Sequence, residues 1–296
     1  MASRPARLLL ACHCGGCTAT LELAGGERVA RCFCPACRAF HASAFACYLR
    51  LQDVEASSLL SDLEKGEAAV GRLAHTCEEA GVVERLFCSR CYSVLASLPL
   101  SHPRQPLVAL GSVSDTTIPP SLGRDWAERF EEWRVDERAP WWHALPHNPA
   151  QPLPSYRQLR GGCVCGACRF TALSGREFQI QHCYCKLCRS LSGSVGQTWV
   201  PVRPDGFKWT RERALILKRT TGHGSRHVCT ECGVVMSIVY DSQPDCIWPV
   251  AGVIDDESMP EDVGAALCRA IHICCSMKQS WYQLPDDGLP RLKYAG

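Results

Sequence analysis

The stretch His182-Cys183-Tyr184-Cys185-Lys186-Leu187-Cys188-Arg189 decides the architecture, because its C-x-C-x-x-C spacing occurs four times in the chain. The four triplets are Cys12/Cys14/Cys17, Cys32/Cys34/Cys37, Cys163/Cys165/Cys168 and Cys183/Cys185/Cys188. A shift of 151 residues carries the first two triplets onto the last two. The pairs Cys88/Cys91 and Cys229/Cys232 match at a shift of 141, and loops absorb such a difference in length. The sequence therefore predicts a tandem repeat of a metal-binding domain.

Length and composition agree with a division into two domains. We expect domains at residues 1–147 and 158–296, joined by a proline-rich linker at 148–157. A chain of 296 residues suits two domains of ordinary size. The prolines between Pro146 and Pro154 favour an extended connection. Each copy closes on an aromatic pair before Leu-Pro, Trp141-Trp142 in the first and Trp281-Tyr282 in the second.

The 22 cysteines favour metal binding over a secreted disulfide scaffold. Cysteines two or three residues apart are poor disulfide partners and good chelators. The apolar run Leu8–Ala11 meets Cys12 at once, whereas a secretory signal needs roughly 7–15 apolar residues. No segment approaches the ~20 apolar residues of a membrane span. We therefore expect a reducing compartment, the cytoplasm or the nucleus, and neither secretion nor a membrane.

The coarse secondary structure is mostly strand. Alternating or β-branched runs predict strands at 18–23, 169–173, 197–202, 214–218 and 234–240. Helix is expected only in short pieces, at 57–65 and at 123–133, where Trp126, Phe130 and Trp133 would share a face. We interpret those aromatics as core or interdomain packing in preference to a ligand site. The predicted fold class is mainly β with few short helices.

These motifs resemble the glutathione-dependent formaldehyde-activating enzymes, a group that also includes centromere protein V. The resemblance covers nearly the whole chain, twice. It rests on Gly162–Gly166, on His182–Arg189 followed by Gly193-Ser194, on Cys229–Gly233, and on the tail from Trp281 to Pro290. It implies two tandem, zinc-containing, Mss4-like β domains.

The resemblance also implies a structural zinc in each copy. In that family, one zinc is held by the first two cysteines of the opening triplet together with the late C-x-x-C pair. The implied ligands are Cys12, Cys14, Cys88 and Cys91 in the first copy, and Cys163, Cys165, Cys229 and Cys232 in the second. Four thiolates make a closed tetrahedral site that leaves no position for substrate, which fits a structural role.

The middle triplets differ, because no fourth partner is evident in sequence for Cys32/Cys34/Cys37 or for Cys183/Cys185/Cys188. Three protein ligands leave one coordination position for water or a thiol. We therefore expect up to four Zn²⁺ ions, two of them in open sites. A soft three-thiolate site would also accept copper(I).

The family resemblance implies that the open position binds the thiol of glutathione, a group with a pKa near ~8.5 in free cysteine. Metal binding would deprotonate this thiol beside formaldehyde, and the product would be S-hydroxymethylglutathione, a carbon–sulfur lyase type of reaction. Zn²⁺ with three thiolates carries one net negative charge, so cationic neighbours are needed. Arg189, Lys186 and His182, or Arg38 in the first copy, are near enough in sequence. We predict Cys183, Cys185, Cys188, Arg189 and His182 as the catalytic residues.

The two copies are not equivalent. The second has His182, Gly193 and Gly233 where the first has Arg31, Ala42 and Tyr92, so we expect the chemistry in the second copy. The cysteines left over are interpreted as buried apolar residues: Cys17, Cys47, Cys77, Cys168, Cys246, Cys268, Cys274 and Cys275. Metal contact by Cys17 and Cys168, and redox activity of the Cys274-Cys275 pair, are the less favoured readings.

Three functions stay open: the enzyme acting on a thiol and a small carbonyl, a diverged metalloenzyme acting on another, secondary metabolite, and a non-catalytic zinc-stabilised binding module. Four bound Zn²⁺ ions would lower the formal charge from +2 to about −4, so no nucleic-acid partner is indicated. The sequence does not specify an oligomeric state.

Overall fold

The computed structural model describes residues 6–77, 79–139, 141–142, 158–174, 180–259 and 270–294. The predicted linker at 148–157 and Cys268 lie outside the described residues.

The first repeat is built on a seven-stranded sheet in the order β5-β6-β7-β8-β4-β3-β9, with a separate β1-β2 hairpin. Its strands are β1 (Arg7–Ala11), β2 (Thr18–Glu22), β3 (Arg28–Cys32), β4 (Ala46–Arg50), β5 (Val70–Cys77), β6 (Gly81–Cys88), β7 (Val94–Pro99), β8 (Leu107–Ala109) and β9 (Phe130–Trp133). Its helices are α1 (Pro35–His41), α2 (Ala56–Glu64) and α3 (Pro120–Glu128). All neighbouring strands are antiparallel except β3 and β9, which run parallel.

The second repeat divides its strands among three sheets, β10-β11-β14, β13-β12-β19 and β15-β16-β17-β18. Its strands are β10 (Gln158–Gly162), β11 (Cys168–Leu173), β12 (Ile180–Cys183), β13 (Gln197–Trp199), β14 (Lys208–Glu212), β15 (Leu215–Thr221), β16 (Gly224–Cys229), β17 (Val235–Tyr240), β18 (Gln243–Pro249) and β19 (Ala270–Ile273). Helix α4 (Lys186–Ser192) follows β12 as α1 follows β3. The parallel pair β12 and β19 repeats the pair β3 and β9, so both copies close in the same way.

The mainly β class is confirmed, and the described residues contain four α-helices. The alternating burial of β2 and β11 explains why their sequences alternate. The helix expected at 57–65 is found as α2. The helix expected at 123–133 is wrong beyond Glu128, because residues 130–133 pair with β3 as strand β9. Pairing along the sheet edge overrides the local helical periodicity there.

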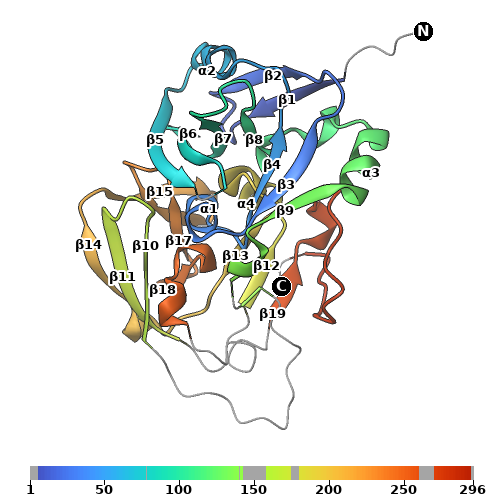
Figure 1. Ribbon diagram of the computed structural model, residues 1–296. Helices are drawn as coiled ribbons and strands as arrows, with labels where there is room; N and C mark the ends of the chain where they lie inside the picture. Colours follow the sequence, from blue (N-terminus) through green and yellow to red (C-terminus); the bar gives the residue numbers. More distant parts are fainter. Residues whose placement is uncertain are drawn as a thin grey trace.

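The two repeats pack through a pseudo-twofold interface. Ser43 Oγ donates a hydrogen bond to the carbonyl of Gly196, and Ser194 Oγ donates one to the carbonyl of Phe45. Residues 43 and 194, and 45 and 196, correspond at the shift of 151. The interface therefore has the self-complementary form of a twofold dimer, although both halves belong to one chain. Helices α1 and α4 lie at its centre (Figure 1).

At two positions of this interface, the backbones of the repeats approach so closely that only glycine fits. A Cβ on Gly111, in the 3₁₀ turn η1 (Leu110–Ser112), would lie 2.1 Å from the carbonyl oxygen of Ser194. A Cβ on Gly252, in η5 (Ala251–Val253), would lie 2.5 Å from that of Arg38. Each repeat thus presses one glycine turn against the short helix of the other.

Aromatic side chains near the ends of the repeats add to this interface. Trp126 is buried and meets Trp281 of the other repeat edge-to-face, with ring centroids 6.3 Å apart. Trp142 contacts His182 of the second repeat at 5.2 Å, and Tyr282 lies 5.5 Å from the guanidinium carbon of Arg31 in the first. The interpretation of Trp126 as interdomain packing is confirmed.

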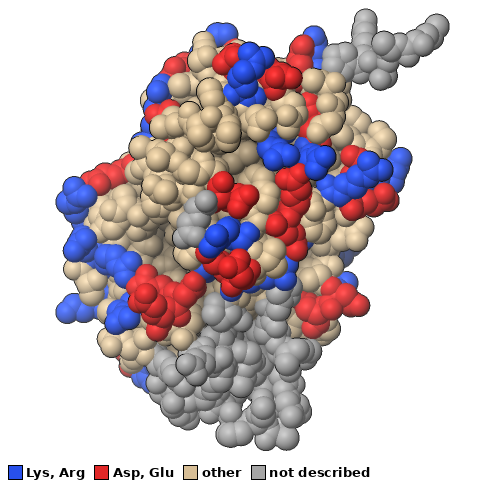
Figure 2. Space-filling view, in the orientation of Figure 1, with Lys and Arg blue, Asp and Glu red and all other residues tan. Residues whose placement is uncertain are grey.

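Charged side chains of both signs are interspersed over the face of the molecule seen in Figure 2. Among the described residues, no helix is both long enough and apolar enough to cross a membrane.

Candidate metal centres

In each repeat, a group of four cysteines, here called the outer cluster, joins the opening C-x-C-x-x-C triplet to the late C-x-x-C pair. One contains Cys12, Cys14, Cys88 and Cys91, and the other contains Cys163, Cys165, Cys229 and Cys232. Within each cluster the sulfur atoms all lie within 4.8 Å of one another. These are the two ligand sets that the resemblance implied.

The spacing of the sulfur atoms fits a tetrahedral metal. In the outer clusters, the Sγ–Sγ distance is 3.5 Å between Cys12 and Cys14 and 3.6 Å between Cys165 and Cys229. Zinc–sulfur bonds of about 2.3 Å in a tetrahedron separate the sulfurs by about 3.8 Å. The described cysteines are all free of disulfides. Both outer clusters therefore fit a closed site for a thiophilic ion such as Zn²⁺.

Backbone amides point at the outer sulfurs, as thiolates require. The amide of Cys17 donates to Cys12 Sγ at 3.2 Å, and that of Cys168 donates to Cys163 Sγ at 3.3 Å. The thiol of Cys17 instead donates to the carbonyl of Ala68 at 3.3 Å. Neither Cys17 nor Cys168 belongs to a cluster, so the third member of each opening triplet supplies its amide and leaves ligation to its neighbours.

Both repeats have a residue in the left-handed conformation directly after the late C-x-x-C pair. Gly233 has φ +74°, and Tyr92 at the matching position has φ +62°. Ala42 (φ +47°) likewise matches Gly193 (φ +66°) at the end of the short helix. The first repeat therefore keeps the backbone conformation at both places without glycine, at a cost in strain.

The inner cluster of the first repeat corrects one expectation. Cys32, Cys34 and Cys37 do have a fourth partner, Cys77, which the spacing had placed among the buried apolar cysteines. Cys77 Sγ lies 3.7 Å from Cys37 Sγ and 4.0 Å from Cys34 Sγ, while Cys32 and Cys34 are 3.6 Å apart. All four side chains are buried. This cluster has the four-thiol form of the outer sites.

A charged network surrounds this buried cluster. Arg85 Nη2 donates to Cys37 Sγ at 3.4 Å, and Arg85 Nη1 donates to the Tyr48 hydroxyl at 3.1 Å. Burial alone would lower the pKa of Arg85, but the Cys37 thiolate and Tyr48 raise it on balance, so the guanidinium stays charged. His41 Nε2 lies 2.9 Å from the Tyr48 hydroxyl, and burial lowers the pKa of His41 to about 3. Arg85 is thus the cation that offsets this cluster, and the histidine is neutral.

The inner cluster of the second repeat holds three cysteines within the described residues: Cys183, Cys185 and Cys188. Cys185 caps the first turn of α4 and accepts the amide of Cys188 at 3.4 Å. Cys183 and Cys188 are buried, whereas Cys185 is partly exposed. This three-thiol cluster therefore fits a metal with one position left for another ligand.

The cation beside this cluster is Arg226, which is 38 residues from Cys188 in the sequence. Its Nη2 lies 3.8 Å from Cys188 Sγ, its Nη1 donates to Thr220 Oγ1 at 2.6 Å, and its side chain is buried. Arg226 corresponds to Arg85 at the shift of 141, and both stand three residues before the late C-x-x-C pair. The R-x-x-C-x-x-C pattern, which both repeats share, could have identified Arg226 from the sequence.

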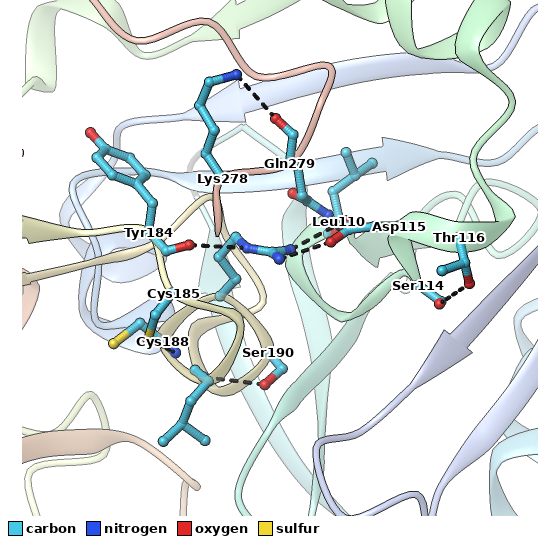
Figure 3. A network of polar contacts seen from close by, with 12 residues as sticks. Leu110, Ser114, Asp115, Thr116, Tyr184, Cys185, Cys188, Ser190, Lys278 and Gln279 are labelled. Carbon is cyan, nitrogen blue, oxygen red and sulfur yellow. Dashed lines mark hydrogen bonds and ion pairs between the residues drawn. The ribbon is translucent and has the colours of Figure 1, made fainter. Parts of the chain in front are cut away.

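Arg189, expected beside the metal, lies in the interface between the repeats. Its Nη2 pairs with Asp115 of the first repeat at 2.8 Å and its Nε donates to the carbonyl of Tyr184 at 3.3 Å. Figure 3 shows Cys185 and Cys188 at one side of this network and Asp115 at the other. Arg38 makes the matching ion pair with Asp256. Both arginines therefore bind a carboxylate of the opposite repeat.

The remaining predicted side chains have other surroundings. His182 is buried, and its Nδ1 lies 2.9 Å from Thr198 Oγ1 while its ring packs against Trp142 and His272. Lys186 is exposed. Of the leftover cysteines, Cys17, Cys47 and Cys168 are buried as expected, and Cys246 and Cys275 are partly exposed. Cys274 is also buried, and its side chain interacts with Cys183 of the inner cluster.

Comparison with known proteins agrees with this duplicated pattern. The family model described as glutathione-dependent formaldehyde-activating enzyme matches residues 8–133 and 158–276. A Halomonas elongata protein named "Putative glutathione-dependent formaldehyde-activating enzyme" is 26% identical over 133 residues, which cover 43% of this chain and 80% of that protein. A crystal structure of a Rhodobacter sphaeroides protein aligns with 36% of this chain and 94% of its own, at 21% identity and a TM-score of 0.29. Because the family model matches most of the chain, once in each repeat, the chain belongs to the glutathione-dependent formaldehyde-activating enzyme family.

Proposed function

We propose that the second repeat joins the thiol of glutathione to formaldehyde at the cluster of Cys183, Cys185 and Cys188. The observation that carries this proposal is the three-thiol cluster, with Cys185 partly exposed, in a chain of this family. The other three clusters each contain four thiols. A substrate thiol would therefore find an open coordination position only in the second repeat.

The residues fit Zn²⁺ as the resident ion, although copper(I) would also suit three thiolates. Cys183, Cys185 and Cys188 would hold it, and when bound it would lower the pKa of a fourth thiol so that the thiolate predominates at neutral pH. The thiolate sulfur then attacks the carbonyl carbon and forms the carbon–sulfur bond. The π electrons of the carbonyl move to its oxygen, which takes up a proton to give S-hydroxymethylglutathione.

The chain's own contribution is charge compensation. Three thiolates already outweigh a divalent cation by one charge, and a substrate thiolate adds a second. Arg226 lies against Cys188 Sγ, so its guanidinium would stabilise this negative charge. Its position is fixed by Thr220 and by the ring of Trp199, 5.5 Å from the guanidinium carbon.

The test compares formaldehyde and glutathione exchange rates by NMR in three samples: the wild type, Cys188→Ser and a protein-free blank. We expect faster exchange with the wild type alone, because the uncatalysed addition sets the rate in the other two. Cys246→Ser is the matched control, since Cys246 is a partly exposed cysteine of the same repeat outside every cluster. Equal rates in all samples would remove this activity. Glutathione binding without acceleration would then favour a binding module, and absence of binding would favour a metalloenzyme for another metabolite.

We propose two Mss4-like domains at 1–147 and 158–296, supported by the family matches at 8–133 and 158–276. We also propose residence in a reducing compartment, the cytoplasm first, supported by the free thiols of the described clusters. The substrate pair of glutathione and formaldehyde follows from the family.

A further inference from the structure

Among the described residues, the inner cluster of the first repeat has a fourth thiol, Cys77, within 4.8 Å of all the others, and the inner cluster of the second repeat has three such thiols. Cys77 enters through an extension of a hairpin. In the first repeat, the ladder between β5 and β6 continues through the pairs Thr76–Val82 and Cys77–Gly81. In the second repeat, the ladder between β15 and β16 ends at Thr221–Gly224. Counted from the matching residues Cys88 and Cys229, this end corresponds to the pair His75–Val83.

The extra length of β5 brings the Cys77 thiol to the other three sulfurs of the inner cluster. Cys77 Sγ contacts Cys34 Sγ and Cys37 Sγ at distances of 4.0 and 3.7 Å, which fit a shared tetrahedral metal. The relative exposure is 4% for Cys77 and no more than 1% for Cys32, Cys34 and Cys37. A substrate thiol would therefore find neither a free coordination position nor a path from solvent.

The surrounding side chains are also those of a closed site. Cys37 Sγ lies 3.7 Å from the hydroxyl of Tyr48, which stands where the second repeat has Trp199. Tyr48 in turn lies 3.4 Å from Ser97 Oγ and bonds to His41 and Arg85. This polar network contacts the sulfur of Cys37, whose side chain is buried.

We propose that Cys32, Cys34, Cys37 and Cys77 form a closed structural metal site, in which Cys77 takes the coordination position that a substrate thiol would occupy in the second repeat. The first repeat then does not catalyse, and its inner metal instead ties the β5–β6 hairpin to β3 and α1. This inference goes beyond the proposed function, because it concerns the repeat to which no reaction is assigned.

The first test measures metal release from the full-length zinc-loaded chain to a chromogenic chelator. In the wild type we expect one rapidly released ion, from the three-thiol cluster, and three slowly released ions. Cys77→Ala should release a second ion rapidly, about tenfold or more faster than in the wild type, because a ligand has been lost. Cys47→Ala is the matched control, since Cys47 is a buried cysteine of the same repeat outside every cluster, and it should behave as the wild type. One rapid ion in Cys77→Ala, or two in the wild type, would overturn the proposal.

The second test does not use Cys77→Ala, so it decides the matter even if that variant fails to fold. The chain is loaded with ¹¹³Cd²⁺, and its NMR spectrum is recorded with and without glutathione. Cys188→Ser identifies the resonance of the second repeat's inner site by its loss, and the proposal expects the three other resonances, which include that of the first repeat's inner site, to stay fixed. A glutathione-dependent shift of any resonance that persists in Cys188→Ser would overturn it. If no resonance shifts, the closed site stands and it is the proposed function of the second repeat that fails.

Discussion

The inner clusters of the two repeats are built from the same structural elements and differ in whether a fourth thiol joins the first three. Each has a strand-end cysteine, a cysteine that caps a seven-residue helix and a cysteine in the first turn of that helix. Each also has a buried arginine from the neighbouring hairpin against the third sulfur. Among the described residues, only the first repeat places a fourth thiol within 4.8 Å of the other three, and only the second repeat leaves a cysteine of its inner cluster partly exposed. On our proposal, the two additional residue pairs of the β5–β6 hairpin distinguish the closed cluster from the open one.

The comparison also shows how a duplicated domain can divide its roles. The pseudo-twofold interface joins corresponding surfaces, so each repeat depends on the other for packing. A repeat that loses its open site still provides that surface. Retention of the first repeat is then explained by packing and by its metal clusters rather than by a second reaction.

The largest expected effect is a difference in thermal stability between variants of the outer and inner clusters of the second repeat. Cys229→Ser should lower the melting temperature of the zinc-loaded chain by about 10 °C or more, because metal binding in a closed site is coupled to folding. Cys188→Ser should melt close to the wild type while it loses thiol binding. Calorimetry of the two variants in parallel checks this. A larger loss of thermal stability in Cys188→Ser would show that the inner cluster is the structural one.

Much of the fold could be predicted, because the repeated cysteine spacing marks the same turns twice. The strands expected after the first knuckles and the short helix α2 were confirmed. The helix expected at 123–133 failed in its second half because Phe130 and Trp133 belong to β9. That strand depends on a partner about a hundred residues earlier in the chain, and local periodicity carries no information on such a pairing.

The candidate sites were predicted where ligands are close in sequence and missed where they are not. Cys77 and Cys47 are isolated cysteines between Cys37 and Cys88, so no spacing assigned Cys77 to a cluster. Arg189 was predicted as a catalytic residue because it follows Cys188 in the sequence, but its side chain points toward the other repeat. Arg226 reaches Cys188 from a hairpin 38 residues further along the chain. A comparison of the two repeats position by position would have found Arg85 and Arg226 together.

A smaller effect is expected from removal of the arginine charge beside each inner cluster. Arg226→Met should reduce the catalysed rate by about 10–100-fold, as loss of a side chain that supports metal ligands commonly does. Arg85→Met should leave that rate within about twofold, since its cluster is assigned no reaction, and should act on stability instead. Exchange rates and thermal melts of both variants test the difference. Equal losses of activity in the two would contradict a division of roles between the repeats.

The smallest expected effect concerns the two ion pairs that cross the interface, and it tests whether Arg189 acts in packing or in catalysis. Asp115→Asn removes the carboxylate that pairs with Arg189, whose side chain is 4% exposed, while Asp115 itself is 40% exposed. Because a buried guanidinium loses its charged partner but keeps the carbonyl of Tyr184, we expect a destabilisation of about 1–2 kcal/mol.

Asp256→Asn is the matched change at the pseudo-symmetric pair with Arg38 and should cost about as much. Neither variant should change KM or kcat, since both pairs lie in the interface and Arg226 supplies the cation at Cys188. Denaturant melts and steady-state rates measured on the same preparations separate the two roles. A loss of kcat in Asp115→Asn without one in Asp256→Asn would show that the ion pair positions Arg189 for the reaction, as its place beside Cys188 in the sequence first indicated.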